Sequence, residues 1–213
     1  LLEGLVKHNG PMVTRDTPVE SLPAAFREYA NFMDLEPHQF AGPEAQVAAL
    51  SDDIAYNNHD IDDGIAAGLF TIDDLMDLPI VGDEFRAVKL EYAHLSDRMV
   101  SYEAVRRLIG LWVNDLTAET GRRAKQDAPQ SAAEVRAMDV PLVAFSEELE
   151  SRQRALRAFL YERMYKHYTV NRMRSKAKRM LAELFQIFLS EPDTLPSPWR
   201  QDASQANEAR RAR

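Results

Sequence analysis

EAQVAALSDDIAYNNHDIDDGIAAGL, residues 44–69, is the stretch that decides the fold class. Its apolar residues recur at spacings of three, four and seven positions, which is how side chains are spaced along one face of an α-helix. The residues of this apolar stripe are Val47, Leu50, Ile54, Ile61 and Ile65. We therefore expect one long helix that begins near residues 42–45 and ends near Gly68.

The rest of the chain has the same helical character. It contains 213 residues, 45% of them hydrophobic, so it can bury a sizeable core, and runs of alternating polarity are few. The sequence predicts an all-α fold. A short helix should follow Thr71 as its N-cap and stop at Pro79. Longer helices are expected over residues 82–95, 99–120, 145–168 and about 171–189, and residues 121–131 should be the loosest internal connection.

The apolar pattern predicts one domain over residues 1–200. Beyond Arg200 the pattern ends, and we expect residues 201–213 to form a disordered tail. The chain starts with Leu1 rather than Met, already inside an apolar helix-like pattern, so we expect further polypeptide upstream.

Composition excludes several classes of protein. The chain has no cysteine, so it can form neither disulfides nor thiolate metal sites, and it is compatible with a reducing compartment. No apolar run approaches the roughly 20 residues that a membrane-spanning helix needs, and no signal peptide is visible. We expect a cytoplasmic protein without a membrane partner.

The charged residues are unevenly distributed. Residues 41–80 contain nine Asp or Glu and no Lys or Arg, whereas residues 151–180 contain ten Lys or Arg and one acidic residue, Glu162. The two segments either neutralise each other across a helix interface, or together hold a divalent cation and the phosphate oxygens bound to it. The net charge of −8 argues against general nucleic-acid binding.

One face of the long acidic helix is a candidate site. Because each helical residue advances by about 100°, positions four apart lie on nearly the same side. Asp52, Tyr56 and Asp60 therefore form one polar stripe, which is either a solvated face or part of a site. A tyrosine and two asparagines in mid-helix favour a site, because a purely solvated face more often uses strong helix formers.

Other metal motifs fail on inspection. A calcium loop of the EF-hand type beginning at Asn58 would need glycine where the chain has Asp63. The His59–Asp60 dipeptide is too short to be a specific signal. The remaining histidines have no ligand-like spacing, so packing or surface positions are expected for all of them: His8, His38, His94 and His167.

Four segments carry a family resemblance: LEGLVKHNGP at residues 2–11, the opening stretch at 44–69, FLYERMYKHYTV at 159–170 and FLSEPDTLPSPWR at 188–200. Together they resemble the C-terminal two-thirds of the dGTP triphosphohydrolase family, within the HD phosphohydrolase superfamily. The resemblance implies a helical HD-domain-type fold. It also implies a divalent metal (Mg²⁺, Mn²⁺ or another transition metal), hydrolysis of a deoxynucleoside triphosphate with dGTP as the expected substrate, and a homo-oligomer.

The same resemblance implies roles for individual residues. Asp52 would ligate the metal, Tyr56 would contact the sugar, and Asp60 would lie near the sugar hydroxyl. Arg157 would touch the triphosphate, and Tyr165, eight residues later on the same helix face, would abut the deoxyribose and base. The catalytic residues and remaining metal ligands are expected upstream of Leu1, so this chain alone should be inactive. His59–Asp60 should not be the metal-binding His–Asp pair of the family.

Two alternatives to the hydrolase remain open. The chain could be a non-catalytic all-α module whose basic helix meets single-stranded nucleic acid or a partner protein, with the acidic helix merely solvated. It could also be a homologue that senses deoxynucleoside triphosphates without hydrolysing them.

Overall fold

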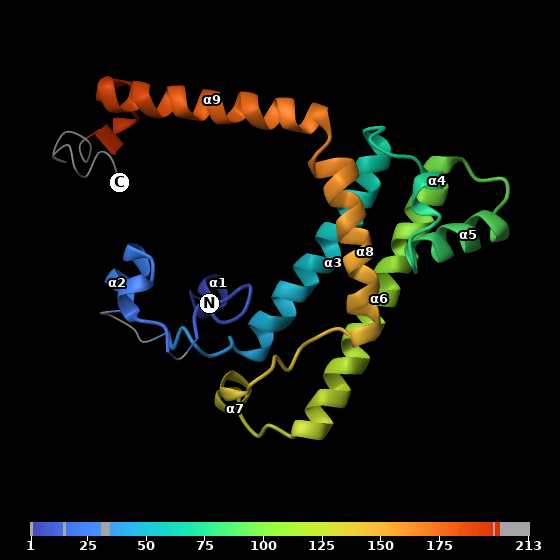
Figure 1. The fold of residues 1–213 in the computed structure, drawn as a ribbon, viewed down its shortest axis with the longest axis horizontal. Coiled ribbons are helices and arrows are strands. Elements are labelled where there is room, and N and C mark those ends of the chain that lie inside the picture. The colour runs from blue at the N-terminus through green and yellow to red at the C-terminus, as the bar shows by residue number, and fades with distance from the viewer. Residues whose placement is uncertain (1, 15, 31–34, 198, 201–213) are drawn as a thin grey trace. The chain divides into compact units, whose positions relative to one another are not determined.

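The computed structural model describes residues 2–14, 16–30, 35–197, 199 and 200 (Figure 1). The chain divides into two compact units, Leu1–Leu160 and Tyr161–Arg213, which are treated separately below. Every regular element in the described part of the chain is a helix, so the predicted all-α fold is confirmed. The tail predicted for residues 201–213 lies outside the described residues.

Helix α3 (Pro43–Ala66) is the long helix predicted from the apolar stripe, and its ends agree with the prediction. The helix begins with Pro43, in the first turn, where a missing N–H costs no intrahelical hydrogen bond. Gly68 follows the end of the helix with φ of +66°. Ile54 and Ile61 are buried against α6 (Asp97–Asp127), which buries Leu108 and Trp112. Both helices belong to the first unit, and their shared apolar faces form its core.

The short helix α4 (Ile72–Leu75) begins as predicted. The Thr71 hydroxyl accepts a hydrogen bond from the Asp74 backbone N–H at 3.3 Å, and the Asp74 carboxylate accepts one from the Thr71 N–H at 2.8 Å. This reciprocal arrangement satisfies two backbone donors at the start of the helix. The next helix, α5 (Val81–Glu91), packs against both α4 and α6.

The prediction that residues 121–131 form a loose connection is wrong for most of that stretch. Helix α6 continues to Asp127 and ends where Ala128 adopts a left-handed backbone with φ of +43°. Ion pairs stabilise its last turns, since Glu119 accepts hydrogen bonds from both Arg122 and Arg123. Helix propensities alone do not include such side-chain pairs. A short helix that we did not predict, α7 (Ala132–Ala137), follows, with Ser131 as its N-cap.

The helix expected over residues 145–168 is divided. Helix α8 (Glu147–Leu160) closes the first unit, and the second unit opens with a π-helical turn, η2 (Tyr161–Tyr165), followed by α9 (Tyr168–Ser190). Four short elements complete the described chain: α1 (Leu2–Val6), η1 (Val19–Ser21), α2 (Ala24–Ala30) and η3 (Pro192–Thr194).

Candidate functional site

Asp52 lies on the exposed side of α3 and faces a histidine from another element. The Nε2 atom of His8, in the segment that follows α1, is 3.5 Å from an Asp52 carboxylate oxygen. The Asp52 side chain is 72% exposed, so both groups of this pair are open to solvent. Imidazole nitrogen and carboxylate oxygen are both good ligands for a divalent transition metal.

The next residue, Asp53, faces an arginine of α8. Its carboxylate lies 3.4 Å from the Arg157 guanidinium on α8, which also donates a hydrogen bond to the Gln153 side chain at 3.2 Å. One acidic residue of α3 is therefore neutralised by a basic residue of α8, as one of the two interpretations of the charge pattern requires. The Arg157 side chain nevertheless remains 46% exposed.

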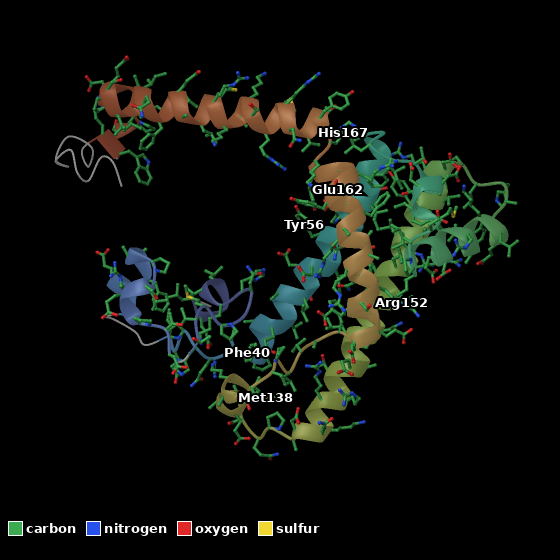
Figure 2. The ribbon with its side chains drawn as sticks, viewed as in Figure 1. Phe40, Tyr56, Met138, Arg152, Glu162 and His167 are labelled. Atoms are coloured by element: carbon green, nitrogen blue, oxygen red, sulfur yellow. The ribbon has the colours of Figure 1, made fainter. Side chains whose placement is uncertain are left out.

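Tyr56 and Asp60 do not share one environment. Tyr56 projects from α3 and is 58% exposed (Figure 2), whereas Asp60 is buried with 7% exposure. A step of four residues rotates the side chain by about 40°, so Asp60 has turned by about 80° from Asp52 and lies toward the buried Ile61. The predicted polar stripe therefore runs from the surface into the core.

A cleft of about 250 Å³ opens beside this face. The polar part of its lining includes Lys7, His8 and Asp53. The apolar part includes Phe40 and Val143. The buried Gln46 side chain holds the walls together. Its amide nitrogen donates to the Ala41 carbonyl at 2.8 Å, and its amide oxygen accepts from the Val143 N–H at 3.0 Å.

An ion network fixes the segment that carries His8. Lys7 is completely buried, and its ammonium donates to the Glu3 carboxylate at 3.2 Å and to the Phe40 carbonyl at 3.4 Å. Arg136 of α7 donates twice to Glu3, from Nε at 2.8 Å and from an Nη atom at 3.0 Å. The hydrogen bond from Arg136, with a smaller effect from Lys7, lowers the pKa of Glu3. Glu3 is therefore ionised at neutral pH and holds two cations.

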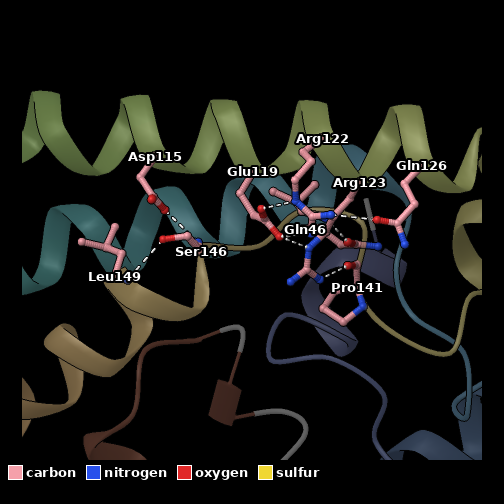
Figure 3. Close-up of polar contacts among 10 residues, drawn as sticks. Gln46, Asp115, Glu119, Arg122, Arg123, Gln126, Pro141, Ser146 and Leu149 are labelled. Atoms are coloured by element: carbon pink, nitrogen blue, oxygen red, sulfur yellow. Dashed lines mark hydrogen bonds and ion pairs between the residues drawn. The ribbon is translucent and has the colours of Figure 1, made fainter.

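Polar contacts with α6 fix the start of α8 (Figure 3). Asp115 accepts a hydrogen bond from the Ser146 N–H at 2.8 Å, and the Ser146 hydroxyl accepts one from the Leu149 N–H at 3.2 Å. Arg123 donates to the Pro141 carbonyl at 2.9 Å, beside the same cleft. These bonds anchor the helix that presents Arg157.

The described residues do not by themselves form a metal site. None of the His, Asp and Glu side chains that the structure describes gather in a group of three or more suited to a metal ion. His8 and Asp52 supply two donors, which is fewer than the usual shell. The His59–Asp60 dipeptide does not add to it, because His59 is exposed and Asp60 is buried.

The structure brings His8 and Asp53 to the candidate site, and sequence reasoning had selected neither. His8 was assigned to packing or the surface because its spacing to other ligands carried no signal, yet the fold brings it to Asp52 across 44 positions. The only available signal was that His8 lies inside LEGLVKHNGP, one of the segments that carry the family resemblance.

The joint position of Arg157 and Tyr165 stays a prediction. Their spacing places them on one face only if the helix between them is a regular α-helix, but regular α geometry ends at Leu160. In the second unit, the Tyr165 carbonyl accepts a hydrogen bond from Arg174 at 3.4 Å.

No helix in the described ranges is both long enough and apolar enough to cross a lipid bilayer.

Comparison with known proteins agrees with the resemblance. Residues 143–213 match the family model described as "Phosphohydrolase-associated domain". A deoxyguanosinetriphosphate triphosphohydrolase-like protein of Parvibaculum lavamentivorans is 56% identical over 93% of this chain and 50% of its own length. The protein of the same name from Caulobacter vibrioides is 52% identical over 100% of this chain and 53% of its own length. The chain thus spans about half the length of the curated relatives it matches, and it belongs to the family of deoxyguanosinetriphosphate triphosphohydrolase-like proteins.

Proposed function

We propose that this chain is part of a metal-dependent hydrolase of deoxynucleoside triphosphates, with dGTP as the expected substrate. Water would add to the α-phosphorus, the bond to the 5′ oxygen would break, and deoxynucleoside and inorganic triphosphate would leave. The names of the relatives support this substrate class. The absence of cysteine is compatible with the cytoplasmic location that we propose for it.

The observation that carries the proposal is the pairing on α3: Asp52 faces His8 while Asp53 faces Arg157, beside a cleft. Exposed ion pairs contribute only about 0–1 kcal/mol, so Arg157 can exchange the Asp53 carboxylate for phosphate oxygens at small cost. Phosphate offers the guanidinium two parallel hydrogen bonds and more negative charge. The surface pair would thus hold a phosphate-binding arginine in place until the substrate arrives.

The proposed roles follow from position. Asp52 would supply one carboxylate ligand of the divalent metal, Tyr56 would contact the sugar from the exposed side of α3, and Asp60 would lie near the sugar hydroxyl at the inner end of the same stripe. Tyr165 would contact the deoxyribose and base. His8, which sequence reasoning did not select, is added as a neighbour of the Asp52 carboxylate.

The decisive experiment uses a full-length protein that contains this chain. Triphosphate release from dGTP in the presence of Mn²⁺ should be lost in Arg157→Ala and retained in Arg154→Ala, a matched control on the exposed side of the same helix. Loss of dGTP binding in Arg157→Ala, measured by calorimetry, would place the defect at phosphate recognition. Equal activity of the two variants would contradict the proposal.

We further propose that residues 1–213 alone release no triphosphate, because the described residues supply too few metal ligands. Measurable triphosphate release by the isolated chain would refute this point.

A second candidate, binding of single-stranded nucleic acid, is favoured by one observation. The exposed basic residues of α9 are concentrated in its first half: Arg172, Arg174, Lys176, Lys178 and Arg179. Backbone binding that uses many such cations weakens by roughly 10³-fold or more over a fourfold rise in salt. Binding in a nucleotide pocket should instead depend on the divalent metal and on deoxyribose, so a salt titration with a labelled oligonucleotide separates the two.

A further inference from the structure

Gln153 is a buried polar side chain whose contacts do not fit a packing role. It lies on α8 with 2% exposure, and its neighbours around a small hollow include Ile80, Trp112 and Leu156. The hollow has no room for a water molecule. The amide nitrogen Nε2 has no hydrogen-bond partner among the residues that the structure describes. Burying an amide donor without a partner lowers stability, so an apolar side chain would suit this environment better.

The other end of the amide binds Arg157, the arginine that we assign to the triphosphate. The two residues are four positions apart and lie on one face of α8. The Gln153 Oε1 atom accepts a hydrogen bond from the Arg157 Nη2 atom at 3.2 Å. A guanidinium can only donate, so the atom that faces it must be the amide oxygen, and the amide nitrogen is left on the side without a partner. The contact with Arg157 therefore decides how the amide is oriented.

Gln153 and Asp53 share one nitrogen of the guanidinium. The Asp53 carboxylate lies 3.4 Å from the same Nη2 atom. This nitrogen carries two hydrogens, one for each acceptor. When phosphate displaces Asp53, the released Nη2 hydrogen and a hydrogen on a neighbouring guanidinium nitrogen form a two-donor edge that matches phosphate oxygens. Gln153 keeps its own hydrogen bond throughout, so the guanidinium stays in place during the exchange.

The two acceptors differ in charge, and this difference matters for a triphosphate. Asp53 is an exposed carboxylate that can be exchanged, whereas Gln153 is buried and neutral. A buried carboxylate at position 153 would also accept from Nη2, but it would offset the positive charge that attracts phosphate. A neutral acceptor orients the guanidinium and leaves its charge available.

We propose that Gln153 is a positioning residue, which holds the Arg157 guanidinium toward the triphosphate through a neutral hydrogen bond from the core. The inference rests on the proposed function, and it gives Gln153 no contact with the substrate. It predicts two effects that a packing residue would not combine. Removal of the amide should weaken recognition of the triphosphate. It should not destabilise the fold, because the buried nitrogen without a partner is removed as well.

The first test uses a full-length protein that contains this chain. Gln153→Met keeps a side chain of similar size but removes the acceptor, and it should lower kcat/KM for triphosphate release from dGTP with Mn²⁺ roughly tenfold. Its Tm should be no lower than that of wild type. The matched control is Leu149→Met, at a buried position one turn earlier on α8, which should keep the kcat/KM of wild type. A Tm several degrees below wild type in Gln153→Met would assign Gln153 to packing and overturn the proposal.

The second test is a double-mutant cycle, which shows whether Gln153 acts through Arg157. Arg157→Lys keeps a cation but loses the planar two-donor edge that needs orienting. In this background Gln153→Met should change kcat/KM by less than about threefold. The same tenfold loss in both backgrounds would overturn the proposal, because Gln153 would then act independently of the guanidinium.

A third variant tests the need for a neutral acceptor. Gln153→Glu keeps an oxygen that can accept from Arg157 but adds a negative charge, so it should lower kcat/KM at least as much as Gln153→Met. Wild-type kcat/KM in Gln153→Glu would contradict this requirement.

Failure of the proposed function and failure of the positioning role give different results. Wild-type kcat/KM in Arg157→Ala would contradict the proposed function, and the positioning role with it. Loss of activity in Arg157→Ala together with wild-type kcat/KM in Gln153→Met would overturn only the positioning role.

Discussion

Glu3→Gln should destabilise the first unit by about 2–3 kcal/mol. The substitution keeps the shape of the side chain but removes the charge that holds the completely buried Lys7 and the Arg136 guanidinium. Hydrogen bonds to charged groups contribute about 1.5–3 kcal/mol, and removing one member of a buried ion pair costs about 3–5 kcal/mol. Because Glu3 is about a quarter exposed, the expected loss lies toward the lower end of this range. The matched control is Glu148→Gln, whose exposed pair with Arg152 should contribute about 0–1 kcal/mol.

Urea unfolding followed by tryptophan fluorescence measures this difference. Trp112 is buried in the first unit and reports on it, and Trp199→Phe removes the other tryptophan from the signal. Glu3→Gln should lower the midpoint while the dependence on urea stays the same. The pKa of Glu3 lies below its usual value of 4.5, mainly because of the bond from Arg136, so its contribution is complete above that pH and is lost as pH falls through the lowered pKa. A loss equal to that of Glu148→Gln at pH 7 would refute the reasoning.

Three further predictions follow from other positions. Gly82→Ala should destabilise the chain by more than about 2 kcal/mol, because the added Cβ would lie 2.1 Å from the Met76 backbone oxygen. Gly110→Ala should instead stabilise the chain by about 0.5–1 kcal/mol, because the added Cβ lies in open space inside α6. Thermal unfolding of the two variants measures both effects. Hydrogen bonds from Arg122, the larger cause, and from Arg123 lower the pKa of Glu119 to about 2. Glu119→Gln should therefore lower the free energy of unfolding at pH 7, and this loss should shrink as the pH falls from 4.5 to 2. Unfolding of both proteins at several pH values tests the sign of this dependence. Asp52→Ala in a full-length protein should abolish triphosphate release without changing its circular dichroism, and wild-type turnover would exclude Asp52 from the site.

Local signals in the sequence were sufficient for the helices that depend on local interactions. The extent of α3 could be predicted because Ile54 and Ile61 recur on a buried face and Pro43 and Gly68 mark its ends, and the Thr71 cap followed from residues three positions apart. The prediction failed at residues 121–127, where ion pairs and the bond from Arg123 to Pro141 extend a helix beyond its apolar pattern.

The candidate site was less accessible to the same reasoning. Helix spacing selected Asp52 and Tyr56 as a polar stripe, and the family resemblance gave them roles and added Arg157. The structure places Tyr56 on the exposed side of α3 and Arg157 against Asp53. His8 could not be found from spacing, because its contact with Asp52 exists only once the segment after α1 is anchored by Lys7. Contacts between residues far apart in the sequence depend on how all the helices pack, and the spacing of apolar residues within one helix carries no information about that packing.

Gln46 has a consequence for the cleft that depends on its chemical type. It donates a hydrogen bond to one wall, at Ala41, and accepts one from the other, at Val143, so a side chain with both a donor and an acceptor is required. An ionised glutamate at this position could only accept and would leave the Ala41 carbonyl without its donor. Since an amide does not titrate, this tie between the Ala41 and Val143 walls should not itself depend on pH, whereas the ion pairs of Glu3 do.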